Sequence, residues 1–395
     1  MNGAGKSSVL DATAILLSWL VNRVKSSGAS GRPILESDIR NGDSTANIGI
    51  TVKSTDGYFN WNIVKARRGH HRKDMVSILI SATEYAKQMQ TKIAEHHGQV
   101  DLPLCAYYPV NRAVLDIPLR IRAKHSFDLL SAYDESLTSG ANFRTFFEWF
   151  REREDLENEN RRYASELVKP EGYEYPDRQL ETVRGALALF MPEFTDLTVR
   201  RNPLRMEVKK SGEALTVNQL SDGEKCLMAI VGDLARRMAI ANPTKLHPLE
   251  GDGVIMIDEV DLHLHPKWQR MILSKLLEVF PNCQFLVSTH SPHVITHVKP
   301  ENIFLLNMTS DGLQAIRPVE SYGKTVDRVL EDLMGLDTTR PDKVTETIRT
   351  IYTKIDSGDL NGARSSIAAL EQEIGDDPEL VKANVLIKRK ELIGK

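Results

Sequence analysis

A chain of 395 residues is long enough to bury a large core or to form two domains. Its 41% hydrophobic and 27% charged residues are typical of a globular protein, and it has no run of 18 apolar residues that would cross a membrane. The net charge of -3 excludes a global positive field that would attract nucleic acid. Three cysteines in apolar surroundings, without metal-ligand spacing, indicate reduced thiols and a cytoplasmic location.

The chain opens with MNGAGKSSVL, a phosphate-binding pattern that continues into an amphipathic helix. Gly5, Lys6 and Ser7 fill the last three positions of GxxxxGK(S/T), in which amides cradle phosphate, the lysine reaches the β and γ oxygens, and the hydroxyl binds Mg²⁺. The residues expected to bind nucleotide here are Asn2, Gly3, Gly5, Lys6, Ser7 and Ser8. The alternative is a flexible Gly/Ser tail.

The first glycine of this pattern would lie one position before Met1, and so would the strand that feeds a P-loop. We therefore expect the natural chain to begin upstream and ATP hydrolysis to be impaired in the 395-residue form.

Residues 46–52 and 58–64 alternate around the turn residues Thr55, Asp56 and Gly57, which predicts a β-hairpin. A basic run follows, made of Lys65, Arg67, Arg68, His70, His71, Arg72 and Lys73. Such a run is typical of a solvated loop, and contact with phosphate or nucleic acid is the alternative.

A helix over residues 75–97 and an apolar strand over 102–108 come next. The strand leads to Arg112, which either senses phosphate or pairs on the surface. Residues 113–176 are charged and aromatic. Within them, phenylalanines at helical spacing predict one apolar face that packs between helices: Phe143, Phe146, Phe147 and Phe150.

The pattern next predicts a helix over 180–191 and strands over 197–200 and 204–209. The run VNQLSDGEK then opens a helix that continues to Asn242. Ser221 is a good cap and Gly223 allows close backbone approach, so the amino end of this helix is a candidate anion site. Taken alone, the run would be only a helix cap.

The stretch GVIMIDEVDLHLHP, residues 253–266, reads as a buried strand that delivers two acids to the edge of a sheet. It matches the Walker B pattern, in which Asp258 would hold Mg²⁺ and Glu259 would polarise the attacking water. The alternative is a strand followed by acids that cap a helix.

Pro266 is expected to start one helix, with Trp268, Ile272, Leu276 and Phe280 facing the sheet, before a parallel strand over 284–288. His263 and His265 have a spacing that a metal can use, but no third ligand accompanies them. A short β segment over 302–316 precedes about 70 helical residues, in which residues 356–359 separate two helices of a hairpin. This last segment contains no acidic cluster of the kind that a two-metal nuclease needs.

The order of these motifs resembles the ATPase head of the ABC superfamily. The branch concerned includes RecF, the structural-maintenance-of-chromosomes (SMC) heads, the overcoming-lysogenization-defect nucleases and the Septu defence ATPase. LSDGEK is similar to the signature motif, which implies nucleotide contacts from Ser221, Gly223 and Glu224. Asp261 matches the D-loop aspartate and His290, in VSTHS, matches the switch histidine that contacts the γ-phosphate.

DLHLHP is similar to the bacterial defence members and to the predicted ATP-binding proteins involved in virulence. The small residues that usually precede the D-loop aspartate are absent, and no glutamine marks a Q-loop near residues 107–112.

The resemblance implies an α/β fold: an ABC-ATPase-like P-loop head with an antiparallel β subdomain, a helical insertion and a C-terminal helical hairpin. The expected parts are residues 1–112, 113–180, 181–320 and 321–395.

The resemblance also implies an ATP hydrolase in which Glu259 and His290 are catalytic and Ser7 and Asp258 hold Mg²⁺. Two or more copies would enclose ATP in composite sites, because the signature helix is not expected to reach its own P-loop. A separate effector, such as an HNH nuclease in prokaryotic antiphage defence, would be controlled by hydrolysis. The alternatives are a nucleotide-gated scaffold with little turnover and a repair ATPase that binds DNA.

Overall fold

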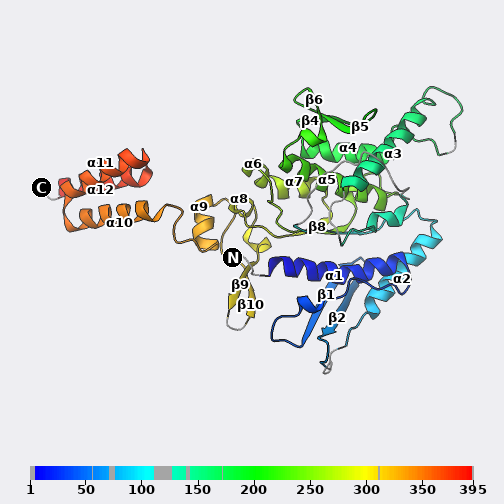
Figure 1. Cartoon of the computed structure of the whole chain (residues 1–395), viewed down its shortest axis with the longest axis horizontal. Coiled ribbons are helices and arrows are strands. Elements are labelled where there is room, and N and C mark those ends of the chain that lie inside the picture. The colour runs from blue at the N-terminus through cyan, green and yellow to red at the C-terminus, as the bar shows by residue number, and fades with distance from the viewer. Residues whose placement is uncertain are drawn as a thin grey trace. The chain divides into compact units, whose positions relative to one another are not determined.

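The computed structural model describes residues 5–55, 57–70, 76–110, 127–138, 143–170, 172–309 and 312–393. The chain divides into two compact units (Figure 1). The first comprises Met1–His297 with Leu306–Ile316, and the second comprises Val298–Leu305 with Arg317–Lys395. The finer division after residues 112, 180 and 320 stays a prediction.

A parallel sheet organises the first unit. Its strands are β3 (Leu104–Tyr108), β7 (Gly253–Ile257) and β8 (Cys283–Val287), in the order β3-β7-β8. The last residue of β7 pairs with the last residue of each neighbour, so all three strands end at the same level. Every residue of β3 is buried, as expected for a parallel strand covered on both faces. The α/β fold class is confirmed, and the residues that follow these strands meet at one edge.

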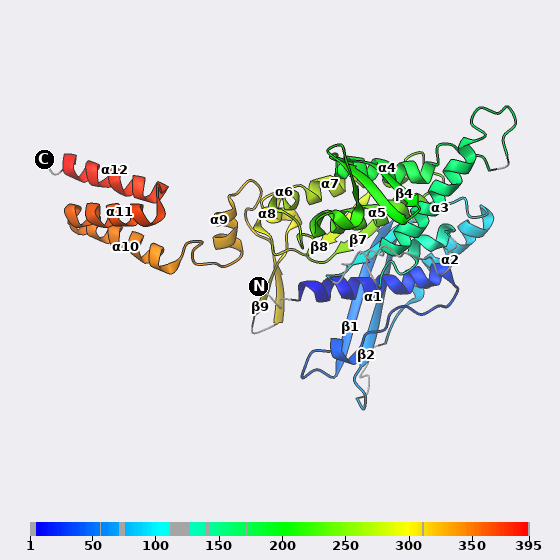
Figure 2. The same ribbon diagram turned by 45° about the horizontal axis from the view of Figure 1, so that its top comes forward.

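Helices cover this sheet. In the first unit they are α1 (Lys6–Lys25), α2 (Ile80–Glu95), α3 (Phe143–Arg161), α4 (Arg178–Phe190), α5 (Asp222–Ala241), α6 (Pro266–Gln269), α7 (Ile272–Val279) and α8 (Pro292–Ile295). Helices α1 and α5 both pack against β3, and Figures 1 and 2 show them on opposite sides of the sheet. The predicted helix after LSDGEK is confirmed as α5, which is buried from Cys226 to Ala241.

Three antiparallel sheets complete the first unit. The predicted hairpin is β1 (Thr45–Ser54) with β2 (Gly57–Ala66). The second sheet is β4 (Phe194–Arg201), β5 (Leu204–Lys210) and β6 (Glu213–Thr216), and the third is β9 (Leu305–Thr309) with β10 (Gly312–Ile316). Asp56 in the predicted hairpin turn lies outside the described residues.

Helix α2 begins at Ile80, five residues later than expected, because Ile78 first pairs with β2. The Ile78 amide donates to the Asn62 carbonyl (3.1 Å), and the Asn62 amide donates back to the Ile78 carbonyl (3.0 Å). In the basic run after β2, the Arg67 guanidinium donates to the carbonyls of Asp43 and Ile39, each at 2.9 Å. This arginine therefore fixes a loop. His71, Arg72, Lys73 and, further on, Arg112 lie outside the described residues.

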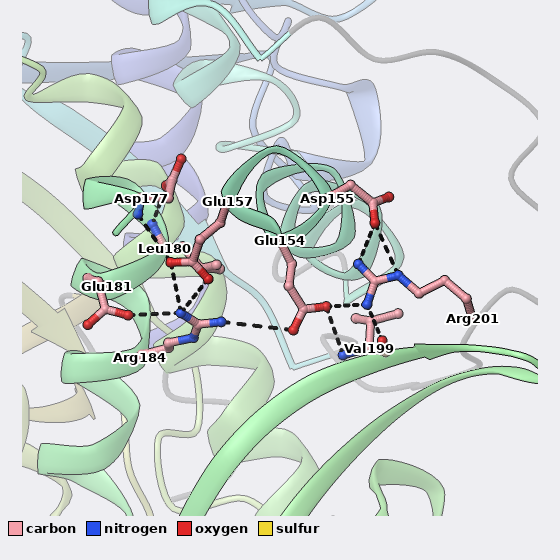
Figure 3. A network of polar contacts seen from close by, with 9 residues as sticks. All are labelled: Glu154, Asp155, Glu157, Asp177, Leu180, Glu181, Arg184, Val199 and Arg201. Carbon is pink, nitrogen blue, oxygen red and sulfur yellow. Dashed lines mark hydrogen bonds and ion pairs between the residues drawn. The ribbon is translucent and has the colours of Figure 1, made fainter. Parts of the chain in front are cut away.

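Two acids of α3 are buried as well as its apolar side. The predicted phenylalanine face lies in the core, and Glu154 and Glu157 are also buried. Figure 3 shows these acids pointing toward Arg184 of α4 and Arg201 of β4. Arg184 lies 2.9 Å from Glu157, and both arginines contact Glu154. Ion pairs therefore fasten α3 to both neighbours.

The helix expected to begin at Pro266 is two short helices. Pro266 does occupy the first helical position, as predicted, but α6 ends at Gln269 and α7 begins at Ile272. Leu276 and Phe280 are buried, whereas Trp268 is only half-buried. The expectation of one continuous helix was wrong, because the Met271 amide bonds to the Trp268 carbonyl three residues back (3.0 Å), which interrupts the α-helical ladder.

The second unit contains α9 (Val326–Arg328), α10 (Asp342–Ser357), α11 (Leu360–Ile374) and α12 (Pro378–Ile393). The predicted hairpin is α10 with α11, separated by Gly358 in the left-handed region (φ 87°). Helix α12 joins it to form a small apolar core of its own. Among the residues that the structure describes, no helix combines the length and hydrophobicity that crossing a bilayer requires.

Candidate functional site

The amino end of α1 is the described part of the phosphate-binding pattern. Gly5 lies in the left-handed region (φ 78°) and its carbonyl accepts the Val9 amide at 3.0 Å, which opens the helix. Helix geometry leaves the first-turn amides of Lys6, Ser7 and Ser8 without acceptors inside the helix, and the helix dipole makes this end positive. An anion is therefore favoured here. Asn2 and Gly3 lie outside the described residues.

The two acids of the Walker B pattern follow the last residue of β7. The Asp258 amide donates to the Tyr108 carbonyl on β3 at 2.9 Å, so the sheet fixes its backbone. Its side chain is 2% exposed. Glu259 has a φ of 47°, in the left-handed region, which is strained for a side chain of this kind. The turn at Glu259 directs the chain sharply away from the strand.

Ser288 joins these acids, and the sequence did not identify it. Its hydroxyl donates to Asp258 Oδ1 and accepts the Glu259 amide at 2.8 Å. The pairing of Ile257 with Val287 puts the next residues, Asp258 and Ser288, side by side. Aligning the carboxyl ends of the predicted strands β7 and β8 in the sequence would have identified Ser288 as the neighbour of Asp258. One serine therefore orients both acids.

The D-loop candidate Asp261 is tied to the loop of the switch histidine. The Thr289 hydroxyl donates to Asp261 Oδ1 at 2.5 Å. Gln269 bridges the same two loops, because its amide donates to the Leu264 carbonyl (2.8 Å) while its oxygen accepts the Ser291 hydroxyl (2.7 Å). Two side chains therefore link the two loops.

His290 lies within electrostatic reach of the other candidates. Burial lowers the pKa of its imidazole, the positive charge of Lys6 lowers it further, and Glu259 and Asp261 oppose the shift. The ring is therefore neutral at pH 7. Tyr107 is near the same edge: burial, then Asp258, raise the pKa of its hydroxyl to about 12. The structure thus gathers Lys6, Asp258, Glu259, Asp261 and His290 at the carboxyl edge of the sheet.

The signature run caps α5. The Ser221 hydroxyl accepts the Glu224 amide, and the Glu224 carboxylate accepts the Ser221 amide at 2.9 Å. Glu224 also pairs with Lys210 at 2.5 Å, so it holds the cap and β5 in place. A Cβ at Gly223 would lie 2.5 Å from the carbonyl oxygen of His263, in the D-loop. The glycine therefore permits the signature helix to pack directly on the D-loop backbone of its own chain.

His265 caps α6 through its Nδ1, which accepts the Lys267 amide at 3.2 Å. Within the described ranges, no group of three or more His, Cys, Asp or Glu residues could hold a metal ion. The three cysteines are buried and free.

Comparison with known proteins agrees with these motifs. A family model described as "AAA domain, putative AbiEii toxin, Type IV TA system" matches residues 111–296. The Retron Ec83 probable ATPase of Escherichia coli is 31% identical over an alignment 445 residues long, gaps included. The alignment covers 98% of this chain and 81% of that protein. The Septu protein PtuA of Bacillus thuringiensis is 28% identical over 166 residues, covering 40% of this chain and 42% of that one.

Among solved structures, the chain matches an Smc head domain from Pyrococcus furiosus with a TM-score of 0.42. That head domain has an extended coiled coil and is bound to the C-terminal domain of ScpA. It is 15% identical and covers 85% of this chain and 91% of that chain. The resemblance to defence-associated ATPases is confirmed by the sequence relatives, and the chain belongs to the same family as the Retron Ec83 probable ATPase.

Proposed function

We propose that this chain binds and hydrolyses ATP with Mg²⁺, that two copies close around the nucleotide, and that this cycle controls a separate effector in antiphage defence. The family supports ATPase activity. The observation that carries the residue assignments is the convergence of Lys6, Asp258, Glu259 and His290 on one edge of the parallel sheet. Open α/β sheets bind their ligands at this edge.

The donor set fits a magnesium nucleotide. Ser7 stands at the positive end of α1, and Asp258 is a buried carboxylate that a serine hydroxyl orients. Hard oxygen donors of these two kinds suit Mg²⁺, and Ser7 and Asp258 would hold an ion that offsets the negative charge of the nucleotide phosphates. Lys6 and the first-turn amides would bind the phosphates themselves.

Glu259 would act as the general base on the attacking water. Ser288 holds the Glu259 backbone, and the sharp turn at φ 47° is the kind of strain found where a side chain must be aimed. His290 would contact the γ-phosphate as a neutral imidazole, in which one nitrogen donates and the other accepts. Asp261, linked to Thr289, would keep that histidine loop in register with the D-loop.

Ser221 and Gly223 would complete the site of a second copy. The amino end of α5 is capped and positive, and in its own chain it packs on the D-loop near His263. A nucleotide shared in this way would favour the closed dimer by its differential affinity for that state. The effector would be a separate protein, for which an HNH nuclease is our candidate, and the helices of the second unit, which form a core of their own, would dock it.

The test replaces the base in a protein whose P-loop is complete, and that protein is the wild type in every comparison below. Glu259→Gln keeps the shape of the side chain but not its basicity, so ATP turnover should fall by roughly a hundredfold or more. ATP binding should remain, and light scattering at micromolar protein should show a persistent ATP-dependent dimer. Glu278→Gln, an exposed acid on α7 paired with Lys275, is the control and should retain wild-type turnover.

If Glu259→Gln hydrolyses ATP at the wild-type rate, the assignment of the base is wrong. If the wild-type protein assembles with ATP and does not hydrolyse it, the chain is a nucleotide-gated scaffold.

A further inference from the structure

Helix α5 carries three charged residues inside the protein. Asp233 is 0% exposed, and Arg236 and Arg237 are each 1% exposed. They lie in the second half of the helix whose first residues form the signature run. Burying charge is costly unless each ion is paired and hydrogen-bonded. The partners of these three residues therefore show which elements they connect.

Asp233 binds both arginines and a tyrosine of the sheet. Arg236 Nη2 donates to one carboxylate oxygen at 2.7 Å, and Arg237 Nε donates to the other at 2.7 Å. The Tyr108 hydroxyl, at the end of β3, also donates to Asp233, at 3.1 Å. Burial would raise the pKa of the Asp233 carboxyl, but Arg237 and Arg236 outweigh burial and hold the pKa below its ordinary value. Burial and Asp233 raise the pKa of Tyr108, so its hydroxyl keeps the proton that it donates.

Arg237 extends the cluster to a third element. Its Nη1 donates to the carbonyls of Ala132 (2.7 Å) and Asp134 (2.8 Å), at the end of the 3₁₀ turn Leu129–Tyr133. The cluster thus ties α5 to β3 and to this turn. A buried ion pair adds little stability compared with apolar packing of the same volume, so a gain in fold stability alone does not explain it.

The same tyrosine reaches the site of the Walker B acids through its backbone. The Tyr108 carbonyl accepts the Asp258 amide at 2.9 Å, and Ser288 then links Asp258 to Glu259. At the other end, Asp233 is twelve residues along α5 from Ser221, or roughly 18 Å of helix. A continuous chain of bonds therefore runs from the signature helix to both acids.

We propose that Asp233 and Tyr108 are positioning residues for ATP hydrolysis. They couple the position of the signature helix to the position of the carboxyl end of β3, and through it to the positions of Asp258 and Glu259. The inference rests on the proposed function. Neither residue touches the reacting atoms. Their role is to transmit the placement of α5, which a second copy would bind through Ser221, to the acids that hydrolyse ATP.

The experiment removes one hydroxyl. Tyr108→Phe keeps the buried ring and deletes the hydrogen bond to Asp233. Tyr133→Phe is the matched control, because Tyr133 is also buried and its hydroxyl donates to the Pro103 carbonyl (2.7 Å), next to the opposite end of β3. Both variants lose one hydrogen bond of a buried tyrosine, and Tyr108→Phe should lower Tm more, because its acceptor is a carboxylate. Turnover is therefore compared per folded molecule.

We expect Tyr108→Phe to lower kcat about tenfold with KM for ATP nearly unchanged, since a small displacement of a catalytic base is costly. Tyr133→Phe should keep the wild-type kcat. Equal kcat values for the two variants, in a protein whose wild type hydrolyses ATP, would overturn this inference alone. Absence of hydrolysis by the wild-type protein would overturn the proposed function and the inference together.

Discussion

Two groups of buried acids in the first unit are held in different ways. On α3, Glu154 and Glu157 are 5% and 9% exposed, and the guanidinium groups of Arg184 and Arg201 meet them. At the carboxyl edge of the sheet, Asp258 is as deeply buried, but the group that orients it is the Ser288 hydroxyl. The guanidinium groups of Arg184 and Arg201 join α3 to two other elements, whereas the Ser288 hydroxyl aims the Asp258 carboxylate from the neighbouring strand. We infer that the first group fixes the position of α3 against α4 and β4, and we propose that the second serves the chemistry.

The largest effect should follow from removing the hydroxyl at the edge. Ser288→Ala frees Asp258 and the Glu259 backbone together, and a displacement of about 1 Å should lower ATP turnover roughly a hundredfold. Ser18→Ala is the matched control, because buried Ser18 likewise donates once, to the Ile15 carbonyl, and accepts one amide, from Arg32. The control should lose stability in urea but keep turnover. Equal turnover in the two variants would remove the distinction between the two groups of acids.

Breaking the ion pairs of α3 should have the opposite effect, a loss of stability without a loss of turnover. Arg184→Met leaves Glu157 buried without its closest guanidinium, so the free energy of unfolding should fall by about 2 kcal/mol. Turnover per folded molecule should not change. Arg364→Met breaks a pair with Glu391 whose side chains are 46% and 45% exposed, so it should cost under about 1 kcal/mol. Urea denaturation followed by circular dichroism measures both, and a fall in turnover for Arg184→Met would show that α3 belongs to the site.

A smaller effect is expected where the signature helix meets the D-loop. In Gly223→Ala the new Cβ would meet the His263 carbonyl oxygen at 2.5 Å, so the loop must shift, and turnover should fall about fivefold. Gly185→Ala on α4 meets nothing within 4 Å and should raise stability by about 0.8 kcal/mol without affecting turnover. Steady-state ATP hydrolysis and thermal unfolding distinguish the two, and full activity of Gly223→Ala would show that the D-loop tolerates the shift.

Elements that depend on residues close together in the sequence could be predicted from it. The capping residues of α5, the apolar run of β7 and the alternation of β1 and β2 depend on neighbours a few residues apart. For the same reason the hairpin of α10 and α11, with its Gly358 turn, was predictable. The predicted connection from β7 to the parallel strand β8 also put Asp258 and His290 just beyond the carboxyl ends of two neighbouring strands.

Features that depend on a distant partner could not be predicted. Asp233 and Arg237 fall on a helix whose spacing does not reveal that Tyr108, 125 residues away in sequence, approaches them. The acids of α3 have the pattern of a solvated face, and only the packing of α4 and β4 buries them. The break between α6 and α7, where the Met271 amide bonds to the Trp268 carbonyl, has no proline or glycine in the sequence to mark it.

The most direct test of the account is complementation between two inactive variants. Lys6→Ala removes the phosphate-binding lysine, and Ser221→Arg places bulk and charge at the cap of α5. Each variant alone should be inactive. In a heterodimer, the Ser221→Arg chain supplies an intact Lys6 and the Lys6→Ala chain supplies an intact Ser221, so one composite site is whole. An equimolar mixture should therefore recover about a quarter of wild-type turnover, since half the dimers are mixed and each has one of two sites.

The control mixes Lys6→Ala with Glu259→Gln. These two residues belong to the same chain's half of the site, so no composite site is whole and no activity should return. Recovery by Lys6→Ala with Ser221→Arg, together with none in the control mixture, is the result that the account predicts. If neither mixture exceeds its separate components, while the wild-type protein hydrolyses ATP, the shared site is contradicted.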